Sequence, residues 1–355
     1  MRILYVATVG GFMPFFKELV RKLLDEGHVV DFAANQSSSK VPDYYKDWGC
    51  RVFDISCSRS PLSIGNIKAI KEIRNIAKNY DVVHCHTPLA GMATRLGCKK
   101  LRKKQGLKVI YTAHGFHFYK GAPKKNWLIY YPIEMICSRW TDVLITINRE
   151  DYELARIKMK AKKVEYVPGV GVHAKEFAGV KIDSKEKRME LGVPENAFLV
   201  LSVGELNDNK NHQTVIKAIS QVKELNIFYV IAGVGDKKTY LESLAKELNV
   251  NLKLLGYRKD VKELYKAADL FIHPSYREGL PVALMEALAS NCSCIASDIR
   301  GNVDLVPKNY CFNPYDYIEL AGLISKKEGS HELNPIYDSV TVNQSMIKMY
   351  KEIIK

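Results

Sequence analysis

The sequence of 355 residues lacks the features that mark exported, membrane-spanning and zinc-binding chains. Its beginning has neither the length nor the cleavage pattern of a signal peptide. No apolar run reaches the roughly 18 residues that a membrane-spanning helix needs. The eight cysteines form no CxxC pair and no zinc-ligand spacing, and no Asp-x-Asp pair lies in a loop suited to a metal. We therefore expect a globular cytoplasmic protein with reduced cysteines and no bound metal.

Positive charge is concentrated in the first half of the chain. Residues 1–168 hold 29 lysines and arginines against 15 aspartates and glutamates, whereas residues 169–355 hold 24 of each kind. The basic clusters lie at residues 99–104, 120, 124–125 and 158–163. Such a surface favours an anionic partner, which could be nucleic acid, an anionic membrane or an acidic substrate. For any one cluster, a solvated helix face is the simpler interpretation. No nucleic-acid-binding module is recognisable, so we expect no nucleic-acid partner.

Strand-like and helix-like segments alternate along the whole chain. In the first half, strands are predicted at residues 3–9, 29–33, 52–55, 81–85, 108–112 and 143–147, and helices at 14–26, 64–79 and 126–138. The pattern restarts with strands at 198–203, 228–232, 252–255, 270–273 and 293–296, and with intervening helices, the first at 211–224. This alternation predicts the α/β class, with parallel, doubly wound sheets.

Two Rossmann-like domains follow from this pattern. We predict the first at residues 1–168 and the second at 169–335, with a last helix, 336–355, that packs back toward the first domain. In such sheets ligands bind beyond the carboxyl ends of the strands, so a cleft between the domains is the expected site.

Residues 273–290, HPSYREGLPVALMEALAS, place two carboxylates in unusual surroundings. Glu278 lies in a loop, and Glu286 lies in a helix that is otherwise apolar around its circumference, a pattern typical of a buried helix. Pro281 suits the first helical position, and the start of the helix offers N–H groups to an anion. A buried Glu286 needs hydrogen-bond donors. These could be a lysine or arginine, water if this face is exposed, or the hydroxyls of a ligand. The last interpretation, with phosphates at the helix start, predicts a sugar nucleotide.

The chain resembles the retaining GT-B glycosyltransferases of family four over essentially its full length. The most specific element is the Glu-x7-Glu pair of residues 273–287. Supporting segments are DVVHCH at 81–86, YTAHG at 111–115, VGELNDNKN at 203–211 and ADLFIHP at 268–274. The segment 114–134 further resembles the bacterial capsule and exopolysaccharide branch. The resemblance implies a GT-B fold with an N-terminal acceptor domain and a C-terminal nucleotide-sugar donor domain.

The resemblance also implies roles for the second domain's residues. Glu286 should accept hydrogen bonds from the ribose hydroxyls, and Glu278 should contact the transferred sugar. The N–H groups around Gly279 and Leu280 should hold the diphosphate, which Lys210 should neutralise. The alternative for Lys210 is an ordinary solvated loop lysine.

Further site residues are implied on both domains. His114 should reach the donor sugar, although a structural core histidine is the alternative. Tyr257 and Arg258 should flank the nucleobase, and Gly204, at the end of a strand, should lie beside the donor. Gly11 belongs to a loop that lines the acceptor and phosphate side in this family, although it could simply form a tight turn.

Two positions depart from the family pattern. His173 stands where relatives often show aspartate. Glu205 stands where many relatives carry arginine, which removes a cation near the diphosphate. Either Lys210 acts alone, or another cation such as Arg258 or Arg300 compensates.

The implied reaction is the transfer of a sugar from a nucleotide sugar, UDP-N-acetylhexosamine or another UDP-hexose, to a lipid-linked (polyprenyl-diphosphate) or saccharide acceptor. The resemblance implies metal independence and no cofactor. It also suggests front-face attack, in which the leaving phosphate assists deprotonation of the acceptor. The diphosphate requires positive charge as the sugar–oxygen bond breaks.

Other functions remain open at this point. Gly233-Val-Gly235 follows a strand, as in an NAD-dependent oxidoreductase, but Lys238 replaces the third glycine and a lone GxG is weak evidence. A sugar-nucleotide epimerase of the same fold is the nearest enzymatic alternative, and a non-enzymatic nucleic-acid binder is a third.

The basic clusters also suggest a place in the cell. Interleaved with Phe116, Phe118, Tyr119 and Trp127, they fit a surface that lies on an anionic membrane without spanning it. We expect peripheral association with the inner face of the cell membrane.

Overall fold

The structure, a computed structural model, describes residues 1–354 and divides into two compact units. The N-terminal unit comprises Met1–Val170 and the chain from Val342 on, and the C-terminal unit is Gly171–Thr341. The first unit thus ends at Val170, where we placed a boundary at 168. The chain rejoins this unit at Val342. The last helix, which we predicted at residues 336–355, begins at Ser339.

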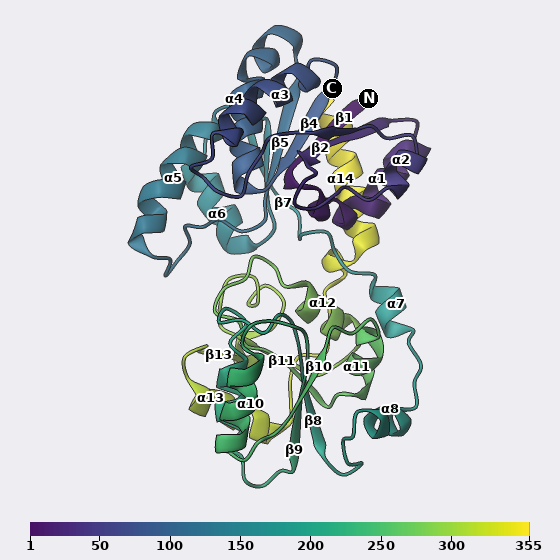
Figure 1. Cartoon of the computed structure of the whole chain (residues 1–355), viewed down its shortest axis with the longest axis vertical. Helices are drawn as coiled ribbons and strands as arrows, with labels where there is room; N and C mark the ends of the chain where they lie inside the picture. The colour runs from purple at the N-terminus through teal and green to yellow at the C-terminus, as the bar shows by residue number, and fades with distance from the viewer. Residues whose placement is uncertain (355) are drawn as a thin grey trace. The chain divides into compact units, whose positions relative to one another are not determined.

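A seven-stranded parallel sheet forms the centre of the N-terminal unit, in the order β3-β2-β1-β4-β5-β6-β7 (Figure 1). Its strands are β1 (Arg2–Val9), β2 (Val29–Asn35), β3 (Val52–Asp54), β4 (Val82–His86), β5 (Lys108–Ala113), β6 (Val143–Thr146) and β7 (Lys163–Tyr166). The helices are α1 (Lys17–Asp25), α2 (Tyr44–Asp47), α3 (Gly65–Ala77), α4 (Pro88–Gln105), α5 (Lys124–Ser138), α6 (Arg149–Lys158) and α14 (Ser339–Ile354). The central strands are apolar runs because helices cover both of their faces.

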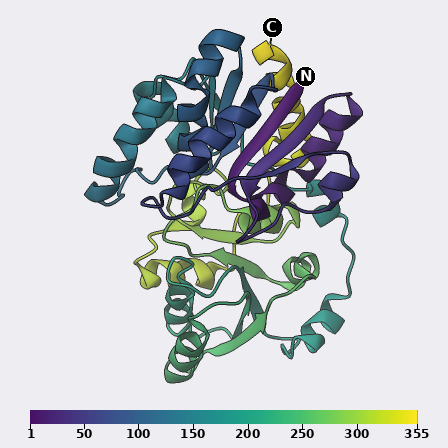
Figure 2. The same cartoon turned by 45° about the horizontal axis from the view of Figure 1, so that its top comes forward.

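The last helix, α14, completes the core on one face of this sheet. Val342, Met346 and Tyr350 belong to the same buried cluster as side chains of β1 and α1. The Tyr350 hydroxyl lies 2.6 Å from the Tyr5 hydroxyl and 2.5 Å from His84 Nδ1. Figures 1 and 2 both show α14, in yellow, beside the purple β1.

The C-terminal unit has a six-stranded parallel sheet in the order β10-β9-β8-β11-β12-β13. Its strands are β8 (Phe198–Val203), β9 (Ile227–Ala232), β10 (Asn251–Gly256), β11 (Leu270–His273), β12 (Cys294–Ser297) and β13 (Cys311–Phe312). Its helices are α7 (Ala174–Ala178), α8 (Ser184–Glu190), α9 (His212–Ile219), α10 (Lys238–Glu247), α11 (Val261–Ala267), α12 (Val282–Ala289) and α13 (Tyr317–Lys326). Both sheets confirm the predicted α/β class.

The strand orders locate where each unit can bind a ligand. Strand order reverses between β1 and β4 in the N-terminal unit and between β8 and β11 in the C-terminal unit. Ligands of doubly wound sheets bind at these points, outside the carboxyl ends of the strands. The loops that follow these four strands are therefore the places where each unit can hold a ligand.

Some local predictions were wrong. The helix predicted at 14–26 begins as a 3-10 helix, Gly10–Phe16, that contains Pro14, and only α1 is α-helical. Pro14 has no N–H to donate to a regular helical turn. Pro281 is the N-cap of α12 and not its first residue, with φ −78° and ψ 117°. Helix α4 and strand β7 were not predicted.

The predicted membrane-facing aromatic residues are mostly inside the N-terminal unit. Phe116 and Phe118 are buried, and Trp127 is half-buried against the same core. Their rings pack on one another, so they cannot supply an exposed surface. Within residues 1–354, no helix combines the length and apolar character that crossing a bilayer requires.

Candidate active site

In the C-terminal unit, two loops meet at the point where the strand order reverses. One follows β8 and contains Lys210, and the other follows β11 and contains Glu278. The Tyr276 N–H donates to the Asn209 carbonyl at 2.8 Å, and Asn209 Nδ2 donates to the Arg277 carbonyl at 3.0 Å. These two hydrogen bonds hold the loops together.

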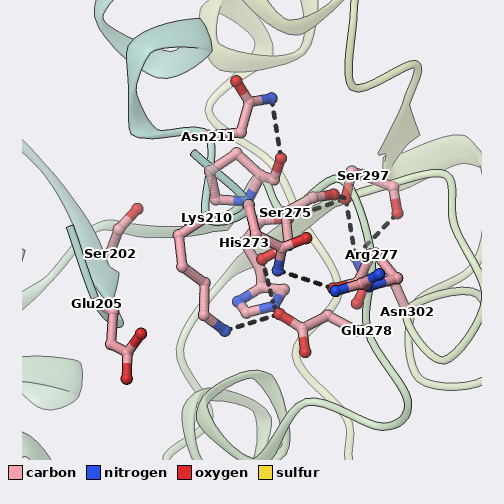
Figure 3. A network of polar contacts seen from close by, with 12 residues as sticks. Ser202, Glu205, Lys210, Asn211, His273, Ser275, Arg277, Glu278, Ser297 and Asn302 are labelled. Carbon is pink, nitrogen blue, oxygen red and sulfur yellow. Dashed lines mark hydrogen bonds and ion pairs between the residues drawn. The ribbon is translucent and has the colours of Figure 1, made fainter. Parts of the chain in front are cut away.

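Lys210 and Glu278 form an ion pair across these loops (Figure 3). Lys210 Nζ lies 2.7 Å from Glu278 Oε1. The same oxygen lies 3.2 Å from Nε2 of His273, the last residue of β11. The structure therefore brings two predicted site residues together, and it adds His273 as a third member.

This environment keeps Glu278 ionised. Burial alone would raise the pKa of Glu278, but the hydrogen bond from His273 and the charge of Lys210 outweigh it and hold this pKa well below its usual range. Burial lowers the pKa of His273, so the imidazole is neutral near pH 7 and its Nε2–H donates to the carboxylate. The site thus holds a carboxylate, a lysine and a neutral hydrogen-bond donor in a mostly buried setting.

The loop after β12 supports Glu278 from behind. Arg300 Nε donates to the Glu278 carbonyl at 3.1 Å. A side chain at Gly301, which has φ +83°, would place its Cβ 2.4 Å from the Gly279 carbonyl oxygen. A glycine is therefore required for this loop to pack against the backbone of Gly279 and Leu280.

Glu286 is half-buried on α12, and its partner is a tyrosine. The Tyr265 hydroxyl donates to Glu286 Oε2 at 3.1 Å. Burial raises the pKa of Glu286, an effect that the Tyr265 hydroxyl and the charge of Lys262 partly offset. Among residues 1–354, no lysine or arginine forms a direct ion pair with Glu286. The other carboxylate oxygen, Oε1, accepts no hydrogen bond from residues 1–354.

The two cations suggested as substitutes for the missing arginine differ in position. Arg258 donates to Asp260 Oδ1 and Glu190 Oε1, both at 2.7 Å, so its guanidinium is engaged by carboxylates. Its charge is thus balanced by protein carboxylates, and compensation by Arg258 stays a prediction. Arg300 contacts the Glu278 loop itself. Glu205 is exposed, and its Oε2 accepts from Asn207 Nδ2 at 2.8 Å.

Two other predicted residues of this unit have simple surroundings. Tyr257 is 76% exposed, so its ring is accessible to a nucleobase. Gly204 faces Lys210, and a Cβ there would lie 3.3 Å from Lys210 Cε. The missing side chain leaves room for the lysine to reach Glu278.

In the N-terminal unit, His114 follows β5 and pairs with a histidine at the end of β4. His86 Nδ1 lies 3.1 Å from His114 Nε2, and the His84 and His86 rings are 4.1 Å apart. Burial lowers the pKa of His114 to about 4 and that of His84 to about 3. His86 Nε2 is buried without a hydrogen-bond partner. The cluster borders a cavity of about 20 Å³, room for one water molecule.

Gly11 lies in the turn after β1, at the other side of the N-terminal switch point. A Cβ at Gly10 would lie 2.3 Å from the Val41 nitrogen, and one at Gly11 would lie 2.3 Å from Ser39 Oγ. The Gly10 N–H donates to the Ser39 carbonyl at 2.9 Å. The close backbone approach therefore accounts for Gly10, whereas Gly11 would meet only the movable Ser39 side chain, and its contact with a ligand stays a prediction.

The glycines that suggested dinucleotide binding also have a packing explanation. A Cβ at Gly233 would lie 1.8 Å from the Gly204 carbonyl oxygen, and one at Gly235 would lie 2.3 Å from the Leu206 carbonyl oxygen. Both residues allow the loop after β9 to approach the loop after β8. The GxG pattern is accounted for without a pyrophosphate.

Sequence reasoning missed His273, Tyr265 and Gly301. His273 had a signal, because it ends a predicted strand five residues before Glu278. Tyr265 and Gly301 lie on other elements, α11 and the loop after β12, and local sequence gives no sign of their contacts. Within residues 1–354, no group of three or more His, Cys, Asp and Glu side chains is placed to hold a metal ion.

The two doubly wound units with polar loops at their switch points place this chain in the class of Rossmann-like α/β proteins, many of which bind nucleotides at that point. Comparisons with known proteins specify the family. Residues 9–170 match the model "Glycosyltransferase Family 4", and residues 183–334 match "Glycosyl transferases group 1". The chain belongs to this glycosyltransferase family, and its fold is GT-B.

Individual relatives agree with this assignment. The chain is 36% identical over 314 residues to the putative glycosyltransferase EpsD of Bacillus subtilis, covering 86% of this chain and 81% of that protein. It is 31% identical over 324 residues to the UDP-Gal:alpha-D-GlcNAc-diphosphoundecaprenol alpha-1,3-galactosyltransferase of Escherichia coli, covering 84% and 80%. The crystal structure of Anabaena HepE in complex with UDP matches with a TM-score of 0.82 at 18% identity, covering 99% of this chain and 100% of that one.

Proposed function

We propose that this glycosyltransferase moves a sugar, with retention of configuration, from a UDP-sugar to a lipid-linked saccharide during synthesis of a bacterial surface polysaccharide. The observation that carries the proposal is the Lys210–Glu278 pair at the switch point of the C-terminal unit. The Escherichia coli relative supports it, since its name specifies a UDP-sugar donor and a diphosphoundecaprenol-linked acceptor. UDP-N-acetylhexosamine is our first candidate donor.

In this proposal, Lys210 binds the diphosphate of the donor and Glu278 contacts its sugar. The Lys210 ammonium has three N–H donors, so it can keep its bond to Glu278 and also bind a phosphate oxygen. It would neutralise the leaving diphosphate together with the N–H groups near Gly279 and Leu280. Glu278, held ionised, would contact the transferred sugar and stabilise positive charge as the sugar–oxygen bond breaks.

Glu286 is assigned to the ribose. Its contact with Tyr265 fixes one carboxylate oxygen, and the other would accept from ribose hydroxyls. Tyr257, Arg258 and Gly204 would line the nucleobase and phosphate sides. Arg258 would act there through its carboxylate-fixed side chain and not as a free charge.

His114 is assigned to the donor sugar, and Gly11 to the acceptor and phosphate side. Because burial keeps His114 neutral, it would act as a hydrogen-bond donor or acceptor and not as a cation. We propose no covalent nucleophile. The leaving phosphate would instead accept the acceptor's proton as attack occurs from the same face. Neither a metal nor a cofactor enters this scheme.

A lipid-linked acceptor would place the enzyme at the cytoplasmic face of the cell membrane. The excess positive charge of residues 1–168 supports an anionic surface as partner.

The test is a donor screen. Purified enzyme is incubated with a panel of UDP-sugars and polyprenyl-diphosphate saccharides in detergent, and UDP release is measured with and without acceptor. Acceptor-dependent UDP release with one donor, and an axial linkage retained in the product by NMR, are expected. A product of inverted configuration would refute retention. Interconversion of UDP-sugars without UDP release would favour the epimerase alternative.

A further inference from the structure

His86, the last residue of β4, is the hydrogen-bond partner of His114 in the N-terminal unit. Its Nδ1 lies 3.1 Å from His114 Nε2, so one of these two nitrogens donates a proton to the other. His114 is half-buried, and its other ring nitrogen, Nδ1, has no hydrogen bond to any group of residues 1–354. His114 Nδ1 is therefore the ring atom that can meet a sugar. Whether it carries a proton depends on the direction of the bond to His86.

The His86 ring is enclosed by aromatic side chains. It lies 4.4 Å from the Phe16 ring and is stacked on the Tyr5 ring at 5.7 Å. His86 is only 1% exposed, and its Nε2 is buried without a hydrogen-bond partner among residues 1–354. Burial disfavours a charged imidazole and lowers the pKa of both His86 and His114. Both rings are therefore neutral near pH 7, and each carries a single ring proton.

The buried Nε2 of His86 favours one direction of this bond. If His114 donated, the single proton of His86 would lie on Nε2, where the protein offers it no acceptor. If His86 donates from Nδ1, its Nε2 is instead an acceptor without a donor. In protein interiors, N–H groups without an acceptor are rarer than acceptors without a donor. The second arrangement is favoured, and it leaves the proton of His114 on Nδ1.

The backbone that follows His86 is held in a strained conformation. Thr87 has φ +66°, which a β-branched residue rarely adopts. Its hydroxyl oxygen accepts from the Thr8 N–H at 3.1 Å and lies 2.7 Å from the Thr8 hydroxyl, which ties the end of β4 to β1. Such strain persists only where the surrounding structure fixes it, and it is common at functional sites. The contacts of Thr87 thus fix the end of β4, from which His86 reaches His114.

We propose that His86 is a positioning residue that holds His114 in the tautomer with its proton on Nδ1. His86 Nδ1–H donates to His114 Nε2, and His114 Nδ1–H donates to a hydroxyl oxygen of the donor sugar. A histidine in water prefers the other tautomer, with its proton on Nε2, so His114 needs this partner. The inference rests on the proposed function, in which His114 contacts the donor sugar, and it specifies that His114 acts there as a hydrogen-bond donor.

The first experiment is long-range 1H–15N correlation NMR of the full-length protein labelled with 15N-histidine, at pH 7 and without ligand. These spectra distinguish protonated ring nitrogens from bare ones, and the variants His86→Phe and His114→Gln assign the two rings. In the wild-type protein we expect a protonated Nδ1 and a bare Nε2 on both histidines. In His86→Phe, the proton of His114 should move mainly to Nε2. In His86→Asn it should stay on Nδ1, because the asparagine amide can donate to His114 in place of the imidazole.

The matched control is His84→Asn. His84 is buried in the same cluster, with its ring 4.1 Å from the His86 ring, and its own hydrogen bonds go to Tyr350 and Thr112. This variant disturbs the cluster without removing the bond to His114. The tautomer of His114 and the kinetics of transfer should therefore remain those of the wild-type protein.

Kinetics with the donor found in the screen test whether the tautomer affects transfer. His86→Phe should lower kcat/KM for the donor roughly three- to tenfold, as expected for the loss of one neutral hydrogen bond. His86→Asn should restore most of this loss. The affinity for UDP, measured by calorimetry, should be unchanged in both variants, because UDP lacks the sugar that His114 contacts. An equal loss of kcat/KM in His84→Asn would mean that the cluster is merely structural and would overturn the role of His86.

The tautomer can be refuted without any measurement of activity. A proton on Nε2 of His114 in the wild-type protein would overturn the inference, and so would a tautomer that is the same in His86→Phe. If the tautomers are as expected but no nucleotide sugar is used, the proposed function fails and the effect of His86 on His114 stands. If transfer proceeds with His114 in the opposite tautomer, the proposed function stands and only this inference is refuted.

Discussion

Lys210 Nζ and Glu278 Oε1 lie 2.7 Å apart, although 68 positions separate the two residues in the sequence. The pair joins the loops after two adjacent strands, and it is 22% exposed on the lysine side and 15% on the glutamate side. Such a pair is less screened by solvent than a surface ion pair. A charge in this setting can act on both the leaving group and the carboxylate beside it.

Replacing Lys210 by methionine should therefore reduce kcat by about 100-fold or more, the usual effect of removing one donor that stabilises developing charge. Steady-state kinetics with the donor found in the screen would measure it. Lys237→Met is the matched control, because Lys237 makes a 2.8 Å ion pair with Asp208 nearby in the same unit. Similar kcat values for the two variants would contradict the role of Lys210.

The sequence predicted much of this arrangement because the site lies on loops between regular elements. Apolar runs located β8 and β11 to the residue, and parallel sheets bring the carboxyl ends of adjacent strands together. That β8 and β11 are neighbours does not follow from these runs, so it was the family resemblance that placed Glu278 and Lys210 in one site. The resemblance to family 4 supplied their roles.

Contacts between distant elements could not be predicted in this way. The Tyr265–Glu286 hydrogen bond depends on how α11 packs beside α12. The ion pair between Arg258 and Glu190 depends on the position of α8. The buried ion pair between Arg95 of α4 and Glu134 of α5 likewise depends on how these two helices pack.

The two carboxylates of residues 273–290, Glu278 and Glu286, should have separable effects on UDP binding and on kcat. Glu286→Gln should weaken binding of both UDP and the full donor, because a hydrogen bond to a charged group contributes roughly 1.5–3 kcal/mol, or about 10- to 150-fold in affinity. Glu278→Gln should leave UDP affinity within a few-fold and depress kcat, because its contact strengthens as the sugar gains charge. Calorimetry with UDP and kinetics on both variants decide the matter. Equal losses of UDP affinity would disprove this division.

Gly301 offers a test of the diphosphate-binding backbone without touching a charged residue. Gly301→Ala would place a Cβ 2.4 Å from the Gly279 carbonyl oxygen and should displace the backbone of Gly279 and Leu280. UDP affinity should fall by roughly tenfold if one phosphate hydrogen bond is lost. Gly106→Ala controls for the left-handed backbone alone, since Gly106 has φ +70° and open space around it. The left-handed backbone should cost both variants about 1–2 kcal/mol of stability. Gly301→Ala should lose more because of its clash with Gly279, and it alone should weaken UDP binding.

Transfer should not depend on a divalent metal. In the proposed scheme Lys210 and the start of α12 neutralise the diphosphate, a task that a metal ion performs elsewhere. Dialysis against EDTA should leave the rate of sugar transfer unchanged, as measured by UDP release. A rate that collapses in EDTA and returns with Mg²⁺ or Mn²⁺ would show that a metal takes part, and the role of Lys210 would then need revision.

Buried neutral histidines should make the protein lose stability as the pH falls below neutrality. Burial lowers the pKa of His84 and of His212 to about 3, and that of His114 to about 4. At pH 7 and above, the folded and unfolded forms of these residues are both mostly neutral, so they contribute little. Below about pH 6.5, these histidines bind protons in the unfolded chain but not in the folded one. The free energy of unfolding therefore falls as the pH falls, until the pH reaches their pKa in the folded protein.

At pH 5.5 each such histidine should lower the free energy of unfolding by about 1.4 kcal/mol. Denaturant titrations between pH 7 and pH 5 measure this slope, above the range where Glu278, whose pKa is lowered, begins to contribute with the same sign. His212→Asn should flatten the slope by one histidine's share, whatever its effect on stability at pH 7. His331→Asn, at an exposed position, is the matched control. A slope that is equal in the two variants would mean that His212 takes up a proton in the folded protein.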